Sequence, residues 1–472
     1  MFLDKGNILS DFNHLFDTEA SCHISLYSHF GMGKTRLIQE LSKSRKTLYF
    51  KAAPLSFEEN VRTLKALCAR QFHKDFQQAK KLTDVLKLLA KHAEQEPLLI
   101  IFDDFPHLAA GNRRISTLIT SFFNRISNAA NLFLVLCKPA SAYEKECTKE
   151  QHAFLLRPFR FFEMRMLYPE MSLEEQMLLY SVTGGVPAYL RFFNPEISVK
   201  DNLYRLFFRE NGSFYRLVPS RTKEFYSASS VMRSILLSMG QEEKKLQEIC
   251  DDTGLTPSAA SSLLLSLSSH NLAERKVPVT EDQTSRRAVY SISDGIFRFW
   301  YTYVFPYQSE IEFGQGETVF NTFVLPALDN YTKNTFETIC REFLILTDEM
   351  DTAPFPMKNV GKWWGQHPTK KRTEAIPIAA YDNNKILLGT CFWTDEWLDI
   401  DALYKLQKHS SLFPDMEEWY YLFSKSDFVS GFEVISGNHV HVFSLEQMCG
   451  IADKYLTAVS YTHLTLPTIL LV

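Results

Sequence analysis

The sequence predicts an α/β fold that begins with a parallel sheet covered by helices. Between about residues 20 and 160, short apolar runs alternate with helical patterns, which is typical of parallel sheets. The expected strands span residues 24–27, 47–52, 98–102, 131–137 and 153–156, with helical segments such as 58–72 and 116–126 between them. Two motifs on this pattern, at residues 24–35 and 98–104, indicate what the sheet binds.

The first motif is a strand, a glycine-containing loop and a helix. In such a loop, backbone N–H groups and the helix N-terminus bind phosphate, the lysine adds positive charge and the threonine hydroxyl ligates Mg²⁺. The residues expected to contact the nucleotide are Gly31, Met32, Gly33, Lys34, Thr35 and Arg36. Ser28 replaces the first glycine of the strict pattern, and a left-handed serine there would cost roughly 1–2 kcal/mol. The alternative is a chance Gly-Lys-Thr in a loop.

The second motif is an apolar strand that ends in Asp103 and Asp104. The first carboxylate is expected to hold Mg²⁺ together with Thr35, and Asp104 stands where many ATPases carry a glutamate that polarises the attacking water. Aspartate is shorter by roughly 1.5 Å of reach, so we expect slow Mg²⁺-dependent ATP hydrolysis with Asp104 and Lys34 as the catalytic residues. Because one strand lies between the two motifs along the chain, we expect an extra strand between them in the sheet.

Length and composition limit the class of protein. A chain of 472 residues predicts about three domains, and 45% hydrophobic with 22% charged residues is typical of soluble globular proteins. The net charge of −4 argues against an overall polyanion-binding surface. Eight scattered cysteines without a Cys-x-x-Cys pair predict neither a zinc framework nor a disulfide scaffold. With no signal region and no apolar run of about 18 residues, we expect a cytoplasmic protein without membrane contact.

The middle of the chain predicts a helical lid at residues 161–230 and a winged helix at 231–305. The lid contains a Gly-Gly-Val-Pro turn at 184–187, which is either a simple turn between helices or a nucleotide-sensing turn. The winged helix is expected as helices 244–253 and 258–269, followed by strands 271–276 and 288–292. Its second helix carries serines but no basic side chain for base edges, which favours protein contacts or lid function over DNA readout. The alternative is contact with the phosphates of DNA, for which the wing offers the basic residues Arg275, Lys276, Arg286 and Arg287.

A third α/β segment follows from about residue 325, with a helix at 331–346 and strands at 376–381 and 385–392. His439 and His441 would lie on one side of a strand, as a satisfied surface pair rather than metal ligands. Residues 460–472 resemble translated sequencing-adaptor read-through, so we expect a non-native tail there and exclude it from the fold prediction. The alternative is a genuine short apolar tail.

These residues together resemble the archaeal-type ATPase family of the AAA superfamily, related to signal-transduction P-loop NTPases. The likeness spans nearly all of residues 1–459 and depends on the runs 31–35, 102–106, 156–159, 184–190, 274–281, 297–301, 361–365 and 422–426. It implies a P-loop ATP-binding domain at 1–160, the lid, the winged helix and a restriction-endonuclease-like domain of unknown function at 306–459.

Departures from the family pattern modify the expected chemistry. The nuclease pattern Glu-Ile-Asp and Glu-Cys-Lys-Trp reads Glu374-Ala375-Ile376 and Thr390-Cys391-Phe392-Trp393, so one carboxylate remains and metal-dependent cleavage is not expected. Cys137-Lys138-Pro139 replaces the Gly-Ser sensor, leaving no hydroxyl at that position. No arginine lies between residues 131 and 156, which argues against a hydrolysing hexameric ring.

The function expected from these features is an ATP·Mg²⁺-binding switch that displays a degenerate nuclease-like domain to an unknown protein partner. The runner-up is a DNA-associated regulator that binds through the winged helix, with nucleic-acid binding otherwise expected to be weak. A third class, a nucleotide-free scaffold, requires that Ser28 disrupts the phosphate loop.

Overall fold

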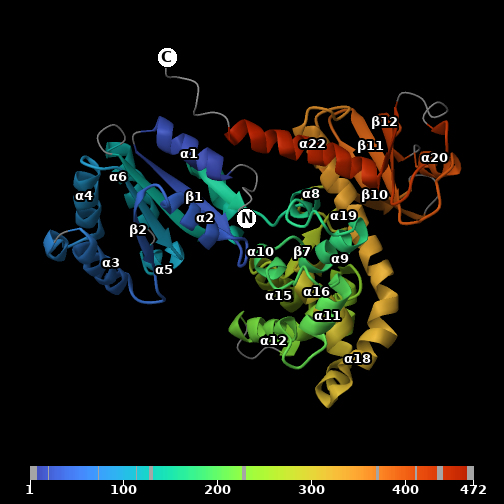
Figure 1. The fold of residues 1–472 in the computed structure, drawn as a ribbon, viewed down its shortest axis with the longest axis horizontal. Helices are drawn as coiled ribbons and strands as arrows, with labels where there is room; N and C mark the ends of the chain where they lie inside the picture. Colours follow the sequence, from blue (N-terminus) through green and yellow to red (C-terminus); the bar gives the residue numbers. More distant parts are fainter. Residues whose placement is uncertain are drawn as a thin grey trace. The chain divides into compact units, whose positions relative to one another are not determined.

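The computed structural model divides the chain into two compact units, residues 1–158 and 159–472. It describes residues 8–19, 21–72, 74–112, 114–126, 131–225, 230–367, 372–409, 412–432 and 439–464. The first unit carries one sheet, and the second carries two further sheets and most of the helices (Figure 1).

The first unit is built on a five-stranded parallel sheet in the order β2-β3-β4-β1-β5 (Figure 1). The strands are β1 (Cys22–Ser28), β2 (Lys46–Lys51), β3 (Leu98–Asp103), β4 (Leu132–Pro139) and β5 (Ala153–Leu156). They lie where the alternation of apolar runs predicted them, and β4 separates β1 from β3 as expected. Since all five strands run the same way, the carboxyl ends of β1, β2 and β3 meet at one edge of the sheet.

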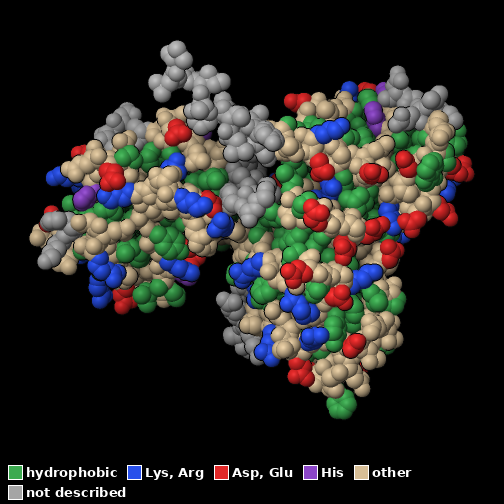
Figure 2. Space-filling model, in the orientation of Figure 1, with side chains coloured by type: hydrophobic (Ala, Val, Ile, Leu, Met, Phe, Trp, Pro, Cys, Tyr) green, Lys and Arg blue, Asp and Glu red, His purple; other side chains and the backbone are tan. Residues whose placement is uncertain are grey.

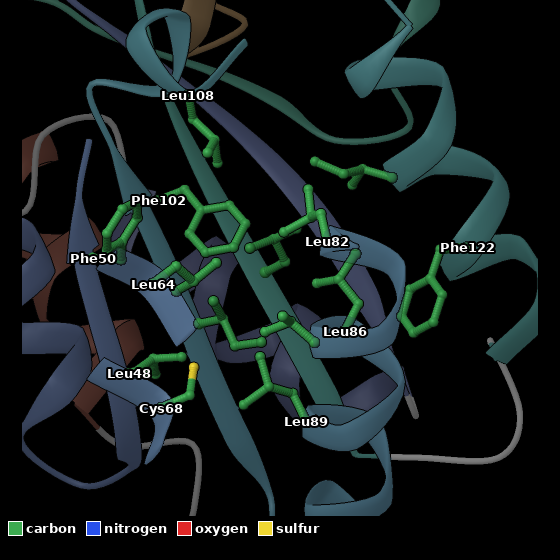
Figure 3. Close-up of a cluster of buried hydrophobic side chains, with 14 of the residues drawn as sticks. Leu48, Phe50, Leu64, Cys68, Leu82, Leu86, Leu89, Phe102, Leu108 and Phe122 are labelled. Atoms are coloured by element: carbon green, nitrogen blue, oxygen red, sulfur yellow. The ribbon is translucent and has the colours of Figure 1, made fainter. Parts of the chain in front are cut away.

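Helices cover both faces of this sheet. They are α1 (Ile8–Thr18), α2 (Lys34–Ser42), α3 (Phe57–Gln71), α4 (Leu82–Ala93), α5 (Phe105–Ala109), α6 (Ile115–Ile126) and the short α7 (Tyr143–Glu146). On one face, Phe102 of β3 lies in a core closed by α3, α4 and α6 (Figure 3). On the other, Phe12 of α1 packs edge-on against Phe154 at 4.7 Å between ring centroids, and Phe16 packs against Phe133 at 4.8 Å.

The second unit begins with a helical region. Its helices are α8 (Phe161–Arg165), α9 (Leu173–Thr183), α10 (Pro187–Leu190), α11 (Val199–Phe207), α12 (Ser213–Phe225) and α13 (Ser230–Ser238). Gly184 ends α9 with a φ of 57°, and Pro187 is the first residue of α10. The two glycines and the proline therefore separate two helices as predicted. A side chain at Gly185 would meet the carbonyl oxygen of Phe159, so only glycine fits this turn.

A small three-stranded sheet follows, in the order β6-β8-β7. Its elements are β6 (Lys244–Lys245), α14 (Leu246–Thr253), α15 (Pro257–Ser269), β7 (Ala273–Lys276) and β8 (Val289–Ile292). Two helices joined by a tight turn at Gly254 thus precede an antiparallel pair. The two helices and two strands expected between residues 244 and 292 are present, with shifts of a few residues at their ends. The helix expected from Lys244 begins only at Leu246, because Lys244 and Lys245 pair with β8 as strand β6.

The chain then returns to the helical region through α16 (Gly295–Phe299). Asp294 caps α16 by accepting hydrogen bonds from the N–H groups of Ile296 and Phe297 at 3.0 and 3.2 Å. The same buried carboxylate accepts a hydrogen bond from the Tyr189 hydroxyl at 2.6 Å. Residues 300–327 continue as π-helical and 3₁₀ turns with the short helices α17 (Gln308–Glu310) and α18 (Gly316–Val319). The cap therefore ties the end of the small sheet to α10.

The C-terminal part contains a mixed five-stranded sheet in the order β13-β12-β11-β10-β9. Its elements are α19 (Leu328–Glu349), β9 (Asn359–Gln366), β10 (Thr373–Tyr381), β11 (Lys385–Phe392), α20 (Asp401–Gln407), β12 (Glu417–Ser424), β13 (Val440–Ser444) and α22 (Leu445–Leu464). Strands β9, β10 and β11 are antiparallel neighbours, whereas β12 and β13 join in parallel. Trp363 and Trp364, to which the sequence analysis assigned no element, lie within β9.

Helix α22 extends five residues into the segment excluded as a non-native tail. Its backbone is helical through Leu464, and residues 465–472 lie outside the described part of the chain. The origin of residues 460–472 stays a prediction.

Candidate nucleotide site

A loop with two left-handed glycines joins β1 to α2. Gly31 has a φ of 82° and Gly33 a φ of 91°, conformations that cost glycine nothing. Gly33 is the N-cap of α2 and supplies no side chain to cap the helix. The first N–H groups of α2 have no intrahelical partner and point outward at the positive end of the helix dipole, which suits an anion.

Ser28 does not disturb this loop. It is the last residue of β1 and pairs with Pro139 of β4 and Leu156 of β5, and its φ is not positive. The prediction that Ser28 would adopt a strained left-handed conformation was wrong, because the tight turn begins only after β1 ends.

Lys34 and the two aspartates after β3 converge in space. The Nζ of Lys34 lies 2.5 Å from Oδ1 of Asp103 and 3.6 Å from Oδ1 of Asp104. Burial opposes the charge on Asp103, but hydrogen bonds from Lys34 and Tyr49 outweigh it and hold the Asp103 pKa below its ordinary value. Burial likewise opposes the charge on Lys34, and the hydrogen bond to Asp103 outweighs it and raises the Lys34 pKa. Both groups are therefore charged at neutral pH.

Two residues of β2 that the sequence analysis did not single out complete the cluster. The hydroxyl of Tyr49 donates a hydrogen bond to Oδ2 of Asp103 at 2.7 Å, and the Nζ of Lys51 lies 3.4 Å from Oδ2 of Asp104. Both reach the carboxylates because β2 pairs in parallel with β3, with Lys51 opposite Asp103. Each oxygen of Asp104 thus faces a lysine.

The backbone of Asp104 is itself unusual. Its φ of 52° and ψ of 44° place it in the left-handed region, where it begins α5. Aspartate and asparagine tolerate this conformation better than other non-glycine residues. The turn directs the backbone N–H of Asp104 to Oδ1 of Asp103 at 3.0 Å, so the two neighbouring residues are held together.

The other residues predicted to contact the nucleotide are not members of this cluster of side chains. Thr35 is exposed at the start of α2, and Met32 is buried beneath the loop. Arg36 is exposed and pairs with Glu40 one turn along α2 at 2.9 Å. The structure therefore brings together Lys34, Asp103 and Asp104, whereas Arg36 contacts only Glu40 among the charged side chains described for α2.

Two neighbouring residues near the end of β4, at the position of the family's sensor hydroxyl, lie in different environments. The thiol of Cys137 is buried beside Lys34 and Asp103, and burial raises its pKa. Lys138 is buried elsewhere, with its Nζ 2.9 Å from Glu146 and 2.6 Å from Glu150. Neighbouring strand residues face opposite sides, so a neutral thiol rather than a hydroxyl or a cation faces the cluster.

The residues compared with a nuclease motif lie on neighbouring strands β10 and β11. Glu374 accepts a hydrogen bond from Arg372 at 2.5 Å and lies 3.7 Å from His409. The bond from Arg372 holds the pKa of Glu374 below its ordinary value. Ile376, at the position of the aspartate, is fully buried in the core. The carboxylate of Glu374 is thus paired with Arg372, whereas a metal-binding nuclease site would place a second carboxylate beside it.

Residues 300–406 match a family described as archaeal and bacterial proteins of unknown function, DUF234. The uncharacterized protein MJECL04 of Methanocaldococcus jannaschii is 24% identical over 441 residues, covering 90% of this chain and 96% of that relative. Among solved structures, the Walker-type ATPase PABY2304 of Pyrococcus abyssi is 14% identical with a TM-score of 0.46, covering 64% of this chain and 96% of that one. A signal transduction ATPase with numerous domains from Pyrococcus horikoshii, PH0952, is 13% identical with a TM-score of 0.30, covering 74% and 50%.

The assignment of the fold depends on the sheet and the loop rather than on these scores. The parallel sheet places β4 between β1 and β3, with a glycine loop after β1 and with Asp103 and Asp104 at the end of β3, as the two motifs predicted. Among the described residues, no helix is both long and apolar enough to cross a membrane. The chain therefore has the P-loop NTPase fold, and its residues 300–406 match the DUF234 proteins of unknown function.

Proposed function

We propose that this protein is an ATP·Mg²⁺-binding switch that hydrolyses ATP slowly. The observation that carries the proposal is the convergence of Lys34, Asp103 and Asp104 beside a loop whose two glycines have positive φ. A lysine and outward N–H groups are donors to the phosphates of a nucleoside triphosphate, and a carboxylate at the same edge of the sheet is a ligand for its Mg²⁺.

The residues present fit both ATP and Mg²⁺. The loop from Gly31 to Gly33 and the start of α2 would bind the phosphates, while Lys34 turns from Asp103 to the phosphate oxygens. Asp103 and the exposed hydroxyl of Thr35 would then hold Mg²⁺. When bound, Mg²⁺ supplies positive charge that neutralises the phosphates. Met32 and Arg36 flank the loop, the first as packing beneath it and the second as an exposed cation.

Slow turnover is proposed from the surroundings of Asp104. Its side chain is short for polarising water, and its two oxygens already lie near Lys34 and Lys51. A buried thiol at Cys137 replaces the hydroxyl that would sense the terminal phosphate. Losing one such donor typically lowers the rate of hydrolysis by about 10²–10³. The protein would therefore stay in its ATP-bound state for a long time before hydrolysis occurs.

The remaining parts would convert nucleotide state into a signal. In this proposal residues 161–230 act as a lid, 231–305 as a winged helix and 306–459 as a degenerate nuclease-like domain that faces a protein partner in the cytoplasm. The helix-turn-helix and antiparallel pair between residues 244 and 292 support the winged helix. The DUF234 match supports a distinct C-terminal module.

The runner-up, a DNA-associated regulator, is disfavoured by the contacts of the wing cations. Arg275 donates hydrogen bonds to the carbonyl oxygens of Gln283 and Ser285. Lys276 pairs with two carboxylates at 2.8 and 2.9 Å, and Arg287 pairs with Glu281 at 3.0 Å. Basic and acidic side chains both occur over the visible face of each unit (Figure 2). Lys276 and Arg287 already face carboxylates and Arg275 has its guanidinium held by carbonyl oxygens, so these side chains gain less from phosphate than free cations would.

Affinities for ATP·Mg²⁺ and for duplex DNA, measured on one preparation of the full chain, test the choice between these functions. We expect ATP binding to be the tighter, and DNA binding to be weak and indifferent to sequence. If the wing contacts phosphates, log affinity should fall linearly with log salt, with a slope of about −0.9 for each phosphate neutralised. Reversing the charge of exposed Arg286 should reduce that slope. A tight, sequence-selective DNA complex at physiological salt would promote the runner-up.

The C-terminal domain is expected not to cleave nucleic acid. Its one remaining carboxylate is paired with Arg372, and Ile376 is buried where a second acid would be needed. Plasmid and single-stranded DNA incubated with the protein and Mg²⁺ or Mn²⁺ should stay intact at all times sampled. Cleavage that disappears in Glu374→Ala, but persists in a control variant such as Glu396→Ala, would show that this expectation is wrong.

A further inference from the structure

Three metal-ligating side chains from distant parts of the first unit meet at its sheet. Glu19 follows the end of α1, Cys22 is the first residue of β1, and His152 directly precedes β5. One ligand atom of each residue lies within 4.8 Å of those of the other two. The thiol belongs to a buried residue, and the other two side chains are 27% and 16% exposed.

The histidine and the glutamate approach each other without forming a hydrogen bond. Nε2 of His152 lies 2.9 Å from Oε1 of Glu19, yet this buried nitrogen has no hydrogen-bond partner. A buried polar atom without a hydrogen-bond partner is unfavourable, and a bound ion would supply the missing interaction. The ligand atoms of all three side chains thus face one another within a distance that one ion could bridge.

We propose that Glu19, Cys22 and His152 form a Zn²⁺ site. Thiolate, imidazole and carboxylate are the ligand types of zinc, whereas Mg²⁺ and Ca²⁺ prefer oxygen alone. Zinc bonds of about 2.0–2.3 Å in a tetrahedron place ligand atoms about 3.3–3.8 Å apart. The three atoms reach that spacing by small side-chain movements. On binding, the S–H bond of Cys22 breaks, its proton leaves to solvent, and the Zn–S bond forms, with water as the fourth ligand.

The position of these residues separates the proposed ion from the nucleotide site. They lie where β1 and β5 begin, at the opposite end of β1 from the phosphate loop after Ser28. An ion here would tie the end of α1 to two strands of the sheet, adding to the aromatic contacts of Phe12 and Phe16. His23, the next residue after Cys22, faces Glu150 at 3.8 Å and takes no part, because neighbouring strand residues point to opposite faces.

Zinc titration of the full-length protein, freed of metal with a chelator, tests the site by competition with a chromophoric zinc chelator. We expect one Zn²⁺ per chain, and at least about 100-fold weaker binding in Cys22→Ser and in His152→Gln, since even indirect partners of a zinc ligand are worth 10–100-fold. Cys147→Ser is the matched control, because Cys147 lies in the same unit on the short turn after α7. Its affinity should equal that of the unchanged protein.

Two further measurements separate loss of the site from loss of the fold. Co²⁺ should produce a thiolate-to-metal charge-transfer band in the unchanged protein and in Cys147→Ser, but not in Cys22→Ser. Zinc should raise the melting temperature of the same two proteins, and Glu19→Gln should show a smaller increase. Equal zinc affinity in the unchanged protein and Cys22→Ser, or no charge-transfer band in the unchanged protein, would overturn the proposal. ATP binding is expected to be unaffected by all these variants, so this result does not depend on the proposed switch.

Discussion

Replacing Lys34 with alanine is expected to weaken ATP·Mg²⁺ binding by roughly 10–100-fold. A hydrogen bond between charged groups contributes about 1.5–3 kcal/mol, and Lys34 directly follows the loop and contacts both carboxylates. Isothermal titration of both proteins with ATP·Mg²⁺ measures the effect. Melting curves recorded alongside show whether removal of the Lys34–Asp103 ion pair also changes stability.

Lys43→Ala is the matched control for this measurement. Lys43 lies just beyond the other end of α2, is 65% exposed and pairs with Glu40. Its removal changes net charge by the same amount without touching the loop. Unchanged ATP affinity in Lys34→Ala would exclude the proposed site and favour the nucleotide-free scaffold, whereas an equal loss in both variants would indicate a general charge effect.

Asp104→Asn is expected to reduce the already slow ATP turnover by about 10²–10³, the usual effect of removing one charge-stabilising group. Asparagine tolerates the left-handed backbone of Asp104, so this substitution removes the charge without straining the turn into α5. Steady-state phosphate release, normalised to the amount of ATP bound, gives the rate. ATP binding itself should change little, because Lys34 and Asp103 remain.

Asp104→Glu provides the complementary measurement. The longer side chain restores reach toward the water and should raise the rate. The gain is limited by the left-handed backbone, which costs a residue such as glutamate roughly 1–2 kcal/mol. Brisk turnover by the unchanged protein that Asp104→Asn abolishes would mean that the aspartate is fully competent, and the switch proposal would then be wrong.

Local patterns were sufficient to predict the first sheet. Each strand is a short apolar run bounded by polar turns, and periodicity within such a run depends only on neighbouring residues. The glycines and Lys34 could be recognised as a loop and a helix start because they are adjacent in sequence. The sequence also predicted that an extra strand separates the two motif strands in the sheet, but it did not predict the full strand order.

Contacts between distant residues could not be predicted in the same way. Tyr49 and Lys51 reach Asp103 and Asp104 only because β2 pairs with β3 in one register, and no pattern along β2 marks them. Whether Ser28 lies in the strand or in the turn could be decided only once the end of β1 was known. Trp363 and Trp364 lie in β9, an edge strand whose mixture of glycine and aromatic residues has no clear alternation.

The sequence by itself determined that this chain has a parallel α/β sheet with a phosphate loop after its first strand and two acids after its third. Those features are local, because a loop and a strand end are each encoded by adjacent residues. Only the tertiary structure decided that both oxygens of Asp104 face lysines and that Glu19, Cys22 and His152 converge. The physical reason is that strand pairing and helix packing bring side chains together across large separations in sequence, which no local spacing encodes.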